Sequence, residues 1–146
     1  MATHILAITY QPKIMAVKTL SCRQTTRFFN PDNPRVVGDD VLLHGWSGLP
    51  YRTPWSWRLP KMPITQAIDM MAFKNTVGFW QHPLTGTPFG TESCLINYYF
   101  WNDPIMDQLS KLDGIFPPTG LEYQHVLESY HGKFTDKPVQ MQVIRW

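Results

Sequence analysis

The sequence contains little of what marks secreted, membrane or redox proteins. Its two cysteines, Cys22 and Cys94, lie far apart and match the spacing of neither a zinc ribbon nor a redox pair, so we expect both to be reduced and buried. No run of about 18 apolar residues is present. The first residues also lack the basic and apolar segments of a secretory signal. The sequence therefore predicts a cytoplasmic protein with no membrane partner.

Residue types that bind metals or phosphate are present, but they are not grouped into known motifs. The five histidines occur singly, without a His-x-x-x-His pair. Residues 86–91 lack the lysine and the following helix of a phosphate-binding loop. Residues 44–48 lack the helix that follows the serine of a nucleophile elbow. We therefore expect neither a metal site nor a cofactor.

The composition indicates a folded chain of one domain. Hydrophobic residues make up 43% of the 146 positions and charged residues 16%, which is enough apolar surface to form a core. No internal repeat and no low-complexity segment divides the chain. We therefore predict a single domain over residues 1–146.

The charge is distributed unevenly along the chain. Residues 1–61 hold eight basic and three acidic side chains, a net charge of +5, whereas the remaining residues hold five basic and eight acidic side chains, a net charge of −3. Tyr51, Trp55 and Trp57 are interspersed among the basic residues. Cations bind phosphates and aromatic faces stack on bases, so this half is suited to a nucleic acid. The alternative is an ordinary solvated face with its aromatic residues in the core.

Local patterns predict short strands and helices without the regular crossovers of a parallel sheet. Strands are expected over residues 4–10, 18–27, 41–44, 63–73, 92–100 and 139–146, a helical turn over residues 12–17, and a long structured loop over residues 45–60. Asp103 and Thr119 are expected to cap two further helices, which Gly114 and Gly132 end. This order favours an α+β fold, a small mixed β-barrel flanked by short helices.

Three separated stretches, in the same order, resemble the ASCH family of the PUA-like superfamily. The first is Gln11-Pro12 with residues 18–23, Lys-Thr-Leu-Ser-Cys-Arg, similar to the Gln-Pro and Lys-Thr-x-Thr-x-Arg signature of the family. The second is residues 37–39, Val-Gly-Asp, similar to a Gly-Asp turn. The third is residues 112–115, Leu-Asp-Gly-Ile, with the helix after it and the closing strand that ends at Trp146.

This resemblance implies a PUA-like β-barrel whose cleft binds RNA or a nucleobase. Some members of the family are small amidohydrolases that remove the acetyl group of N4-acetylcytidine by means of a lysine, a threonine and an acidic residue. Carried over by position, these residues are Lys18, Ser21, in place of the threonine, and Asp113. The family also includes nucleases, so a ribonuclease is a further alternative.

The residues themselves leave the chemistry open. Hydrolysis of an amide needs a nucleophile, a base and a group that stabilises the oxyanion, and Lys18, Ser21 and Asp113 are able to supply this set. Lys18 and Ser21 are three positions apart, so they point to opposite faces of a regular strand but converge on a bend or bulge. In the alternative, Lys18 and Arg23 contact phosphates and Ser21 has no chemical role.

Our leading hypothesis is an RNA-binding or modified-nucleobase-binding domain with a basic, aromatic cleft. An amidohydrolase acting on an N4-acylated cytidine is the second hypothesis. Trp55 and Trp57 are expected to fill the mouth of the barrel. The oligomeric state stays open. The residues expected to contact the ligand are Gln11, Arg23, Arg27, Trp46, Tyr51 and Arg52, beside the catalytic candidates Lys18, Ser21 and Asp113.

Overall fold

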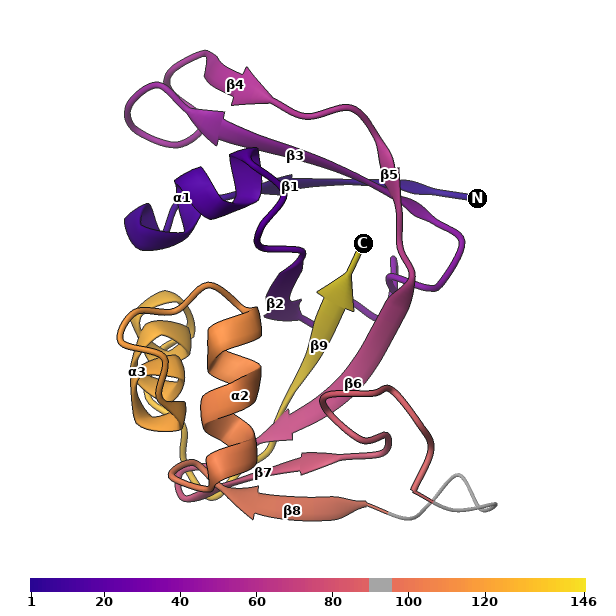
Figure 1. Cartoon of the computed structure of the whole chain (residues 1–146), viewed down its shortest axis with the longest axis vertical. Coiled ribbons are helices and arrows are strands. Elements are labelled where there is room, and N and C mark those ends of the chain that lie inside the picture. The colour runs from indigo at the N-terminus through magenta and orange to yellow at the C-terminus, as the bar shows by residue number, and fades with distance from the viewer. Residues whose placement is uncertain (90–95) are drawn as a thin grey trace.

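The computed structural model describes residues 1–89 and 96–146 and divides them into two sheets and three helices (Figure 1). Cys94 and the first part of the strand predicted over residues 92–100 lie outside the described residues. The elements, in chain order, are β1 (Thr3–Ala7), α1 (Gln11–Lys18), β2 (Gln24–Phe28), β3 (Asp40–Trp46), β4 (Trp55–Arg58), β5 (Met62–Pro63), β6 (Gln66–Ala72), β7 (Thr76–Phe79), β8 (Asn97–Phe100), α2 (Pro104–Leu112), α3 (Gly120–His131) and β9 (Val139–Arg145).

The smaller sheet is formed around β3. Strand β1 pairs with it in parallel, with Ile5 opposite Leu42, and β4 and β5 pair with it antiparallel. Alternate residues of β1 and β3 point inward, because successive side chains of a strand face opposite sides. Leu6 and Leu43 therefore lie in a core that also holds Val17 of α1 and the C-terminal Trp146.

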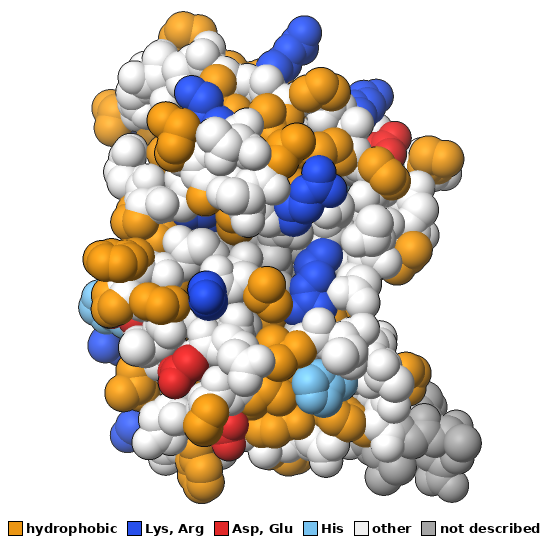
Figure 2. All heavy atoms as spheres, viewed as in Figure 1, with side chains coloured by type: hydrophobic (Ala, Val, Ile, Leu, Met, Phe, Trp, Pro, Cys, Tyr) orange, Lys and Arg blue, Asp and Glu red, His pale blue; other side chains and the backbone are white. Residues whose placement is uncertain are grey.

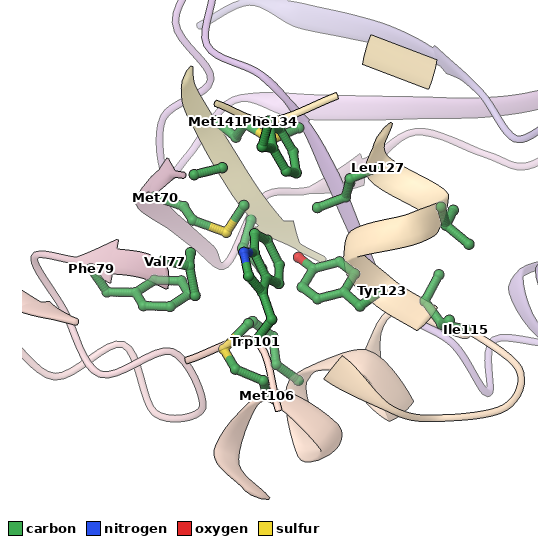
Figure 3. Close-up of a cluster of buried hydrophobic side chains, with 14 of the residues drawn as sticks. Met70, Val77, Phe79, Trp101, Met106, Ile115, Tyr123, Leu127, Phe134 and Met141 are labelled. Atoms are coloured by element: carbon green, nitrogen blue, oxygen red, sulfur yellow. The ribbon is translucent and has the colours of Figure 1, made fainter. Parts of the chain in front are cut away.

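The larger sheet has the strand order β2-β9-β6-β7-β8 and is antiparallel throughout. Helices α2 and α3 pack against it (Figure 1). Between the helices and the sheet, the rings of Trp101 and Tyr123 meet edge to face, with their centroids 6.1 Å apart (Figure 3). Met106 of α2 and Phe79 of β7 complete the same core. This core is the main apolar contact of the fold.

Both predicted helix starts are confirmed. The Asp103 side chain accepts a hydrogen bond from the backbone N–H of Ile105, and the Thr119 side chain accepts one from that of Glu122. Each cap satisfies an N–H group that has no partner within its helix. The predicted closing strand is confirmed as β9.

Two strands were not predicted. Part of the expected loop over residues 45–60 is β4, which pairs with β3 so that Gly45 lies opposite Trp57. Strand β7 lies in a segment for which we predicted no element. Both strands have only four residues, and each is the second strand of a hairpin, β4 after β3 and β7 after β6. Their short patterns give little periodicity to detect.

A mixed α+β architecture is confirmed. The described strands form two open sheets, with β2 and β8 at the edges of the larger one, and they do not close into a barrel. Trp57 packs against the core of the smaller sheet, while Trp55 is partly exposed, so neither fills the mouth of a closed barrel in the described residues. Cys22 is buried, as expected. Every helix in the described ranges is too short or too polar to cross a membrane.

Candidate functional site

A cavity of about 120 Å³ lies between the ends of β1 and β2 and the helices α1 and α3. Its lining comes from segments far apart in the sequence, which the fold brings to the side of the molecule where α1 and α3 lie (Figure 1). The residues that line it are Ala7, Ile8, Thr9, Tyr10, Lys13, Thr25, Thr26, Arg27, Asp113, Ile115, Val126, Leu127, Tyr130 and His131.

Lys13 is a buried cation in this lining. It lies on α1 four residues before Val17, and these two residues form the buried face of the helix. The side chain of Lys13 is therefore directed into the protein, and the residue is only 4% exposed. Its Nζ atom lies 3.4 Å from Oδ2 of Asp113. A buried ammonium group is stable only when a paired anion offsets its loss of hydration, and Asp113 provides that anion.

Asp113 follows the last residue of α2 and is the centre of the polar network. Its Oδ1 atom accepts hydrogen bonds from Nε2 of Gln24 and from Oγ1 of Thr26, each at 3.0 Å. Its Oδ2 atom faces Lys13. All three partners are buried, so the carboxylate is held by protein donors in a defined orientation.

Tyr123 extends this network from α3. Its hydroxyl lies 2.5 Å from Oγ1 of Thr26. Thr26 has a single hydroxyl proton, which it donates to Asp113, so Tyr123 is the donor to Thr26. Burial, and then the charge of Asp113, raises the pKa of Tyr123 well above its usual value, so the phenol keeps this proton. The hydrogen bonds therefore run in one direction, from Tyr123 through Thr26 to Asp113.

Arg27 adds a second positive charge to the cavity wall. Its Nη2 atom donates to the backbone oxygen of Ala7 at 2.5 Å, and its Nε atom donates to Oγ1 of Thr25 at 3.3 Å. Burial, and then the charge of Arg35, lowers the pKa of Arg27, but a guanidinium group remains protonated at neutral pH. Arg27 is thus a fixed cation with its orientation set by the end of β1.

His131 and Tyr130 form the part of the lining nearest Arg27. The ring of His131 packs edge to face on Phe28, with centroids 3.7 Å apart. Burial, and then the charge of Arg27, lowers the pKa of His131, so the ring is neutral at pH 7. Tyr130 accepts a hydrogen bond from Oγ1 of Thr9 at 3.0 Å. These contacts connect α3 to the end of β2 and to the segment that follows β1.

The lining also contains apolar side chains, contributed by four branched aliphatic residues. They are Ile8, Ile115, Val126 and Leu127. The cavity therefore combines two cations, one carboxylate and several hydroxyl groups with aliphatic surface. Such a mixture is typical of sites for small ligands that have both polar edges and apolar faces.

Of the predicted site residues, Asp113 and Arg27 line the cavity. Lys18 is exposed at the end of α1, with its Nζ atom 5.9 Å from the centre of the Trp57 ring. The hydroxyl of Ser21 donates to the backbone oxygen of Ala16 and is also exposed. The side-chain hydrogen bonds of Asp113 thus come from Lys13, Gln24 and Thr26 and not from Lys18 or Ser21.

The remaining predicted contacts lie outside the cavity lining. Gln11 and Arg23 are exposed. Trp46, Tyr51 and Arg52 belong to the hairpin formed by β3 and β4. In the view of Figure 2, most Lys and Arg side chains lie over the half of the molecule that contains the smaller sheet and along the boundary between the two halves. The uneven charge of the sequence therefore has a counterpart on this surface.

Sequence reasoning missed Lys13, Thr26 and Tyr123 as members of the site. One signal was available for Lys13, because it lies four residues before Val17 and a helix places these two side chains on one face. A charged residue on an apolar helix face is unusual and indicates a buried partner. Nothing comparable in the sequence distinguishes Thr26 or Tyr123 from other core residues.

Within residues 1–89 and 96–146, no group of three or more His, Cys, Asp or Glu side chains is arranged to hold a metal ion. No protein-family model, no curated protein and no solved structure matches this chain. The function of this chain is therefore inferred from the geometry of the cavity.

Proposed function

We propose that this protein binds a nucleobase, in RNA or in a modified nucleoside, in the cavity between α1, β2 and α3. The observation that carries the proposal is the pairing of buried Lys13 with Asp113 on the wall of a cavity that Arg27 also lines. A base has donors and acceptors at its edges and two apolar faces, and its nucleotide carries an anionic phosphate. Kinship with the ASCH family, a PUA-like fold and a cytoplasmic location are part of this proposal.

The size and the lining of the cavity support a ligand of about one ring. A volume of 120 Å³ far exceeds the ~10–15 Å³ that a single water requires. Val126 and Leu127 offer aliphatic contact to the face of a ring, while Asp113 offers an acceptor to an exocyclic amino group. Arg27 offers the donors that a phosphate or a carbonyl oxygen needs.

Calorimetric titration with cytidine, uridine and N4-acetylcytidine tests this proposal. Val126 lines the cavity, so Val126→Phe fills it and is expected to abolish binding. Leu121→Phe is the matched control, because Leu121 lies on the same helix with 58% of its surface exposed, and this variant should bind like the wild type. Equal binding by both variants, or no binding of any nucleoside by the wild type, would refute the proposal.

A second candidate function is deacylation of an N4-acylated cytidine. The observation that favours it is the position of Thr26, whose hydroxyl lies between a donor, Tyr123, and an acceptor, Asp113. In the proposed reaction Thr26 attacks the amide carbonyl and its proton passes to Asp113, while Lys13 stabilises the oxyanion. Asp113 returns that proton to the leaving amine, and water then hydrolyses the acyl-threonine to release the acid and restore the threonine hydroxyl.

Release of cytidine from N4-acetylcytidine, followed by mass spectrometry, tests this second function. Thr26→Val and Lys13→Met should both abolish turnover, whereas Ser21→Ala and Lys18→Met should retain it. The opposite result would favour the residues expected from the resemblance, Lys18 and Ser21. Absence of turnover in the wild type would exclude this reaction and leave the binding proposal to be decided by the calorimetry.

A further inference from the structure

We propose that the tip of the β3–β4 hairpin is a stacking site for a second base, so that a single-stranded oligonucleotide is the ligand of this protein. This inference rests on the proposed function, because the first base occupies the cavity. It goes further by naming a separate surface, formed by Trp46 and Tyr51, and by selecting an oligonucleotide over a free nucleoside.

Tyr51 is the most exposed aromatic side chain of the hairpin, with 90% of its surface accessible. Its backbone has a φ of 62°, a left-handed conformation that is unfavourable for a tyrosine. Its ring is tilted at 49° to that of Trp46, with the centroids 5.1 Å apart. The hairpin thus holds a large apolar ring in solvent at a strained position, and such strain is concentrated at ligand-binding sites.

Direct contacts connect this surface to the cavity. The ring of Trp46 meets the buried ring of His44 at 4.9 Å. The backbone oxygen of His44 accepts a hydrogen bond from Ile8, which lines the cavity. Ala7 lies opposite His44 in the paired strands and accepts the hydrogen bond from Arg27. Tyr51 is therefore connected to the cavity wall through the ring of Trp46 and through His44 of β3, the strand that pairs with β1.

The surroundings of the hairpin tip are suited to a polyanion. Arg52 follows Tyr51, and Arg58 lies opposite His44 in the β3–β4 pairing. Lys18 lies over the ring of Trp57 in the same hairpin. Among the described residues, none of these three cations forms an ion pair. They are therefore able to neutralise phosphates of a strand that lies along the hairpin.

A single strand satisfies both parts of this surface, whereas a duplex does not. Bases in a duplex are stacked on their neighbours, so their faces are not accessible to an exposed side chain. Unpaired bases stack on aromatic side chains while cations follow the backbone. With one base in the cavity, Arg27 and Arg52 are placed to contact the backbone that leads to the base on Tyr51.

Binding of cytidine monophosphate and of oligocytidylates of two, four and six nucleotides tests the inference. The wild type should bind an oligomer more tightly than the mononucleotide. Tyr51→Ala should weaken binding of the oligomer by about 5- to 150-fold, the range measured for one stacked base, and leave binding of the mononucleotide unchanged. Tyr51→Phe, which keeps the ring, should retain the affinity. Leu49→Ala is the matched control, because Leu49 is an exposed apolar residue of the same connection.

Each outcome separates the hairpin from the cavity. Equal affinity for mononucleotide and oligomers, or an equal loss in Tyr51→Ala and Leu49→Ala, would overturn the stacking site while the cavity proposal stands. Oligomer binding that depends on Tyr51, without any binding of the mononucleotide, would support the stacking site and refute the cavity. If neither ligand binds, both proposals are wrong.

Discussion

The ammonium group of Lys13 lies 3.4 Å from a carboxylate oxygen of Asp113, although the two residues are 100 positions apart in the chain. Both side chains are almost completely buried. This pair connects α1, which packs beside the smaller sheet, to the residue that follows α2 on the larger sheet. It therefore contributes at once to the packing of the two halves and to the charge of the cavity.

Lys13→Met is expected to lower the free energy of unfolding by about 3–5 kcal/mol. The variant keeps the volume of the side chain but leaves the buried carboxylate of Asp113 without its cation, which is the costly way to break a buried ion pair. Lys18→Met is the control and should change stability by less than about 0.5 kcal/mol, because Lys18 is exposed. Urea denaturation of the two variants measures the difference, and equal stabilities would show that the pair is not needed for folding.

Tyr123→Phe is expected to destabilise the protein by about 1–3 kcal/mol, because Thr26 loses a buried hydrogen-bond donor. Thr26→Val removes the other end of the same hydrogen bond. Since the two residues are in direct contact, the double variant should differ from the sum of the single ones by at least about 0.5 kcal/mol. Strict additivity in a double-mutant cycle would contradict the one-directional network that ends at Asp113.

Stability should fall as the pH is lowered from 7 toward 5. Burial lowers the pKa of His44 and of His131 below the usual value of 6.5, and Arg27 acts in the same direction. The unfolded chain therefore takes up protons in this range that the folded chain does not. The contribution of both rings to stability is complete above pH 6.5, the usual pKa of histidine. It is lost as the pH falls from there through the lower pKa values of the folded protein.

Urea midpoints measured across this pH range test the prediction for these two rings. His131→Phe should make the pH dependence shallower, because one of the two rings with a lowered pKa is removed. Leu121→Ala, at an exposed position of the same helix, is the control and should leave the pH dependence unchanged. A profile that is flat between pH 5 and 7 in the wild type would be inconsistent with a lowered pKa for His44 and His131.

Gly120→Ala is expected to disrupt the packing of α3 on Trp101, which lies three residues before the start of α2. A β-carbon at Gly120 would lie 1.8 Å from the backbone oxygen of Trp101, and a backbone atom cannot turn aside as a flexible side chain can. We expect a loss of at least about 3 kcal/mol, visible as a lower thermal midpoint. Leu121→Ala, at the next and exposed position, should change it little. If Gly120→Ala had the same thermal midpoint as the wild type, α3 would have to move away from Trp101 without a loss of stability.

Helix ends could be predicted because the groups that form them are close in sequence. Asp103 and Thr119 each cap a backbone N–H within three residues, so their role depends on little else in the fold. Strands β4 and β7 could not be predicted in the same way. Gly78 of β7 pairs with Met71 across the β6–β7 hairpin and with Tyr98 of β8 on its other side, so β7 is defined by this pairing and not by a pattern of its own.

The candidate site was predicted in part. The sequence predicts Asp113 and Arg27 as site residues, and both line the cavity. The order of residues 18–23 indicates Lys18 as the lysine of the site, whereas the lysine buried in the cavity wall is Lys13. Five positions along a helix correspond to more than one turn, so the two side chains leave α1 in different directions.

The amino-acid sequence alone is sufficient to predict the starts of α2 and α3, the closing strand and the excess of positive charge in residues 1–61. These features depend on local hydrogen bonds, on the alternation of side chains along a strand and on composition. Only the tertiary structure decided that Thr26 and Lys13 share the carboxylate of Asp113, because those contacts connect residues 87 and 100 positions apart. Contacts of that range form when several elements pack together, and no local pattern encodes them.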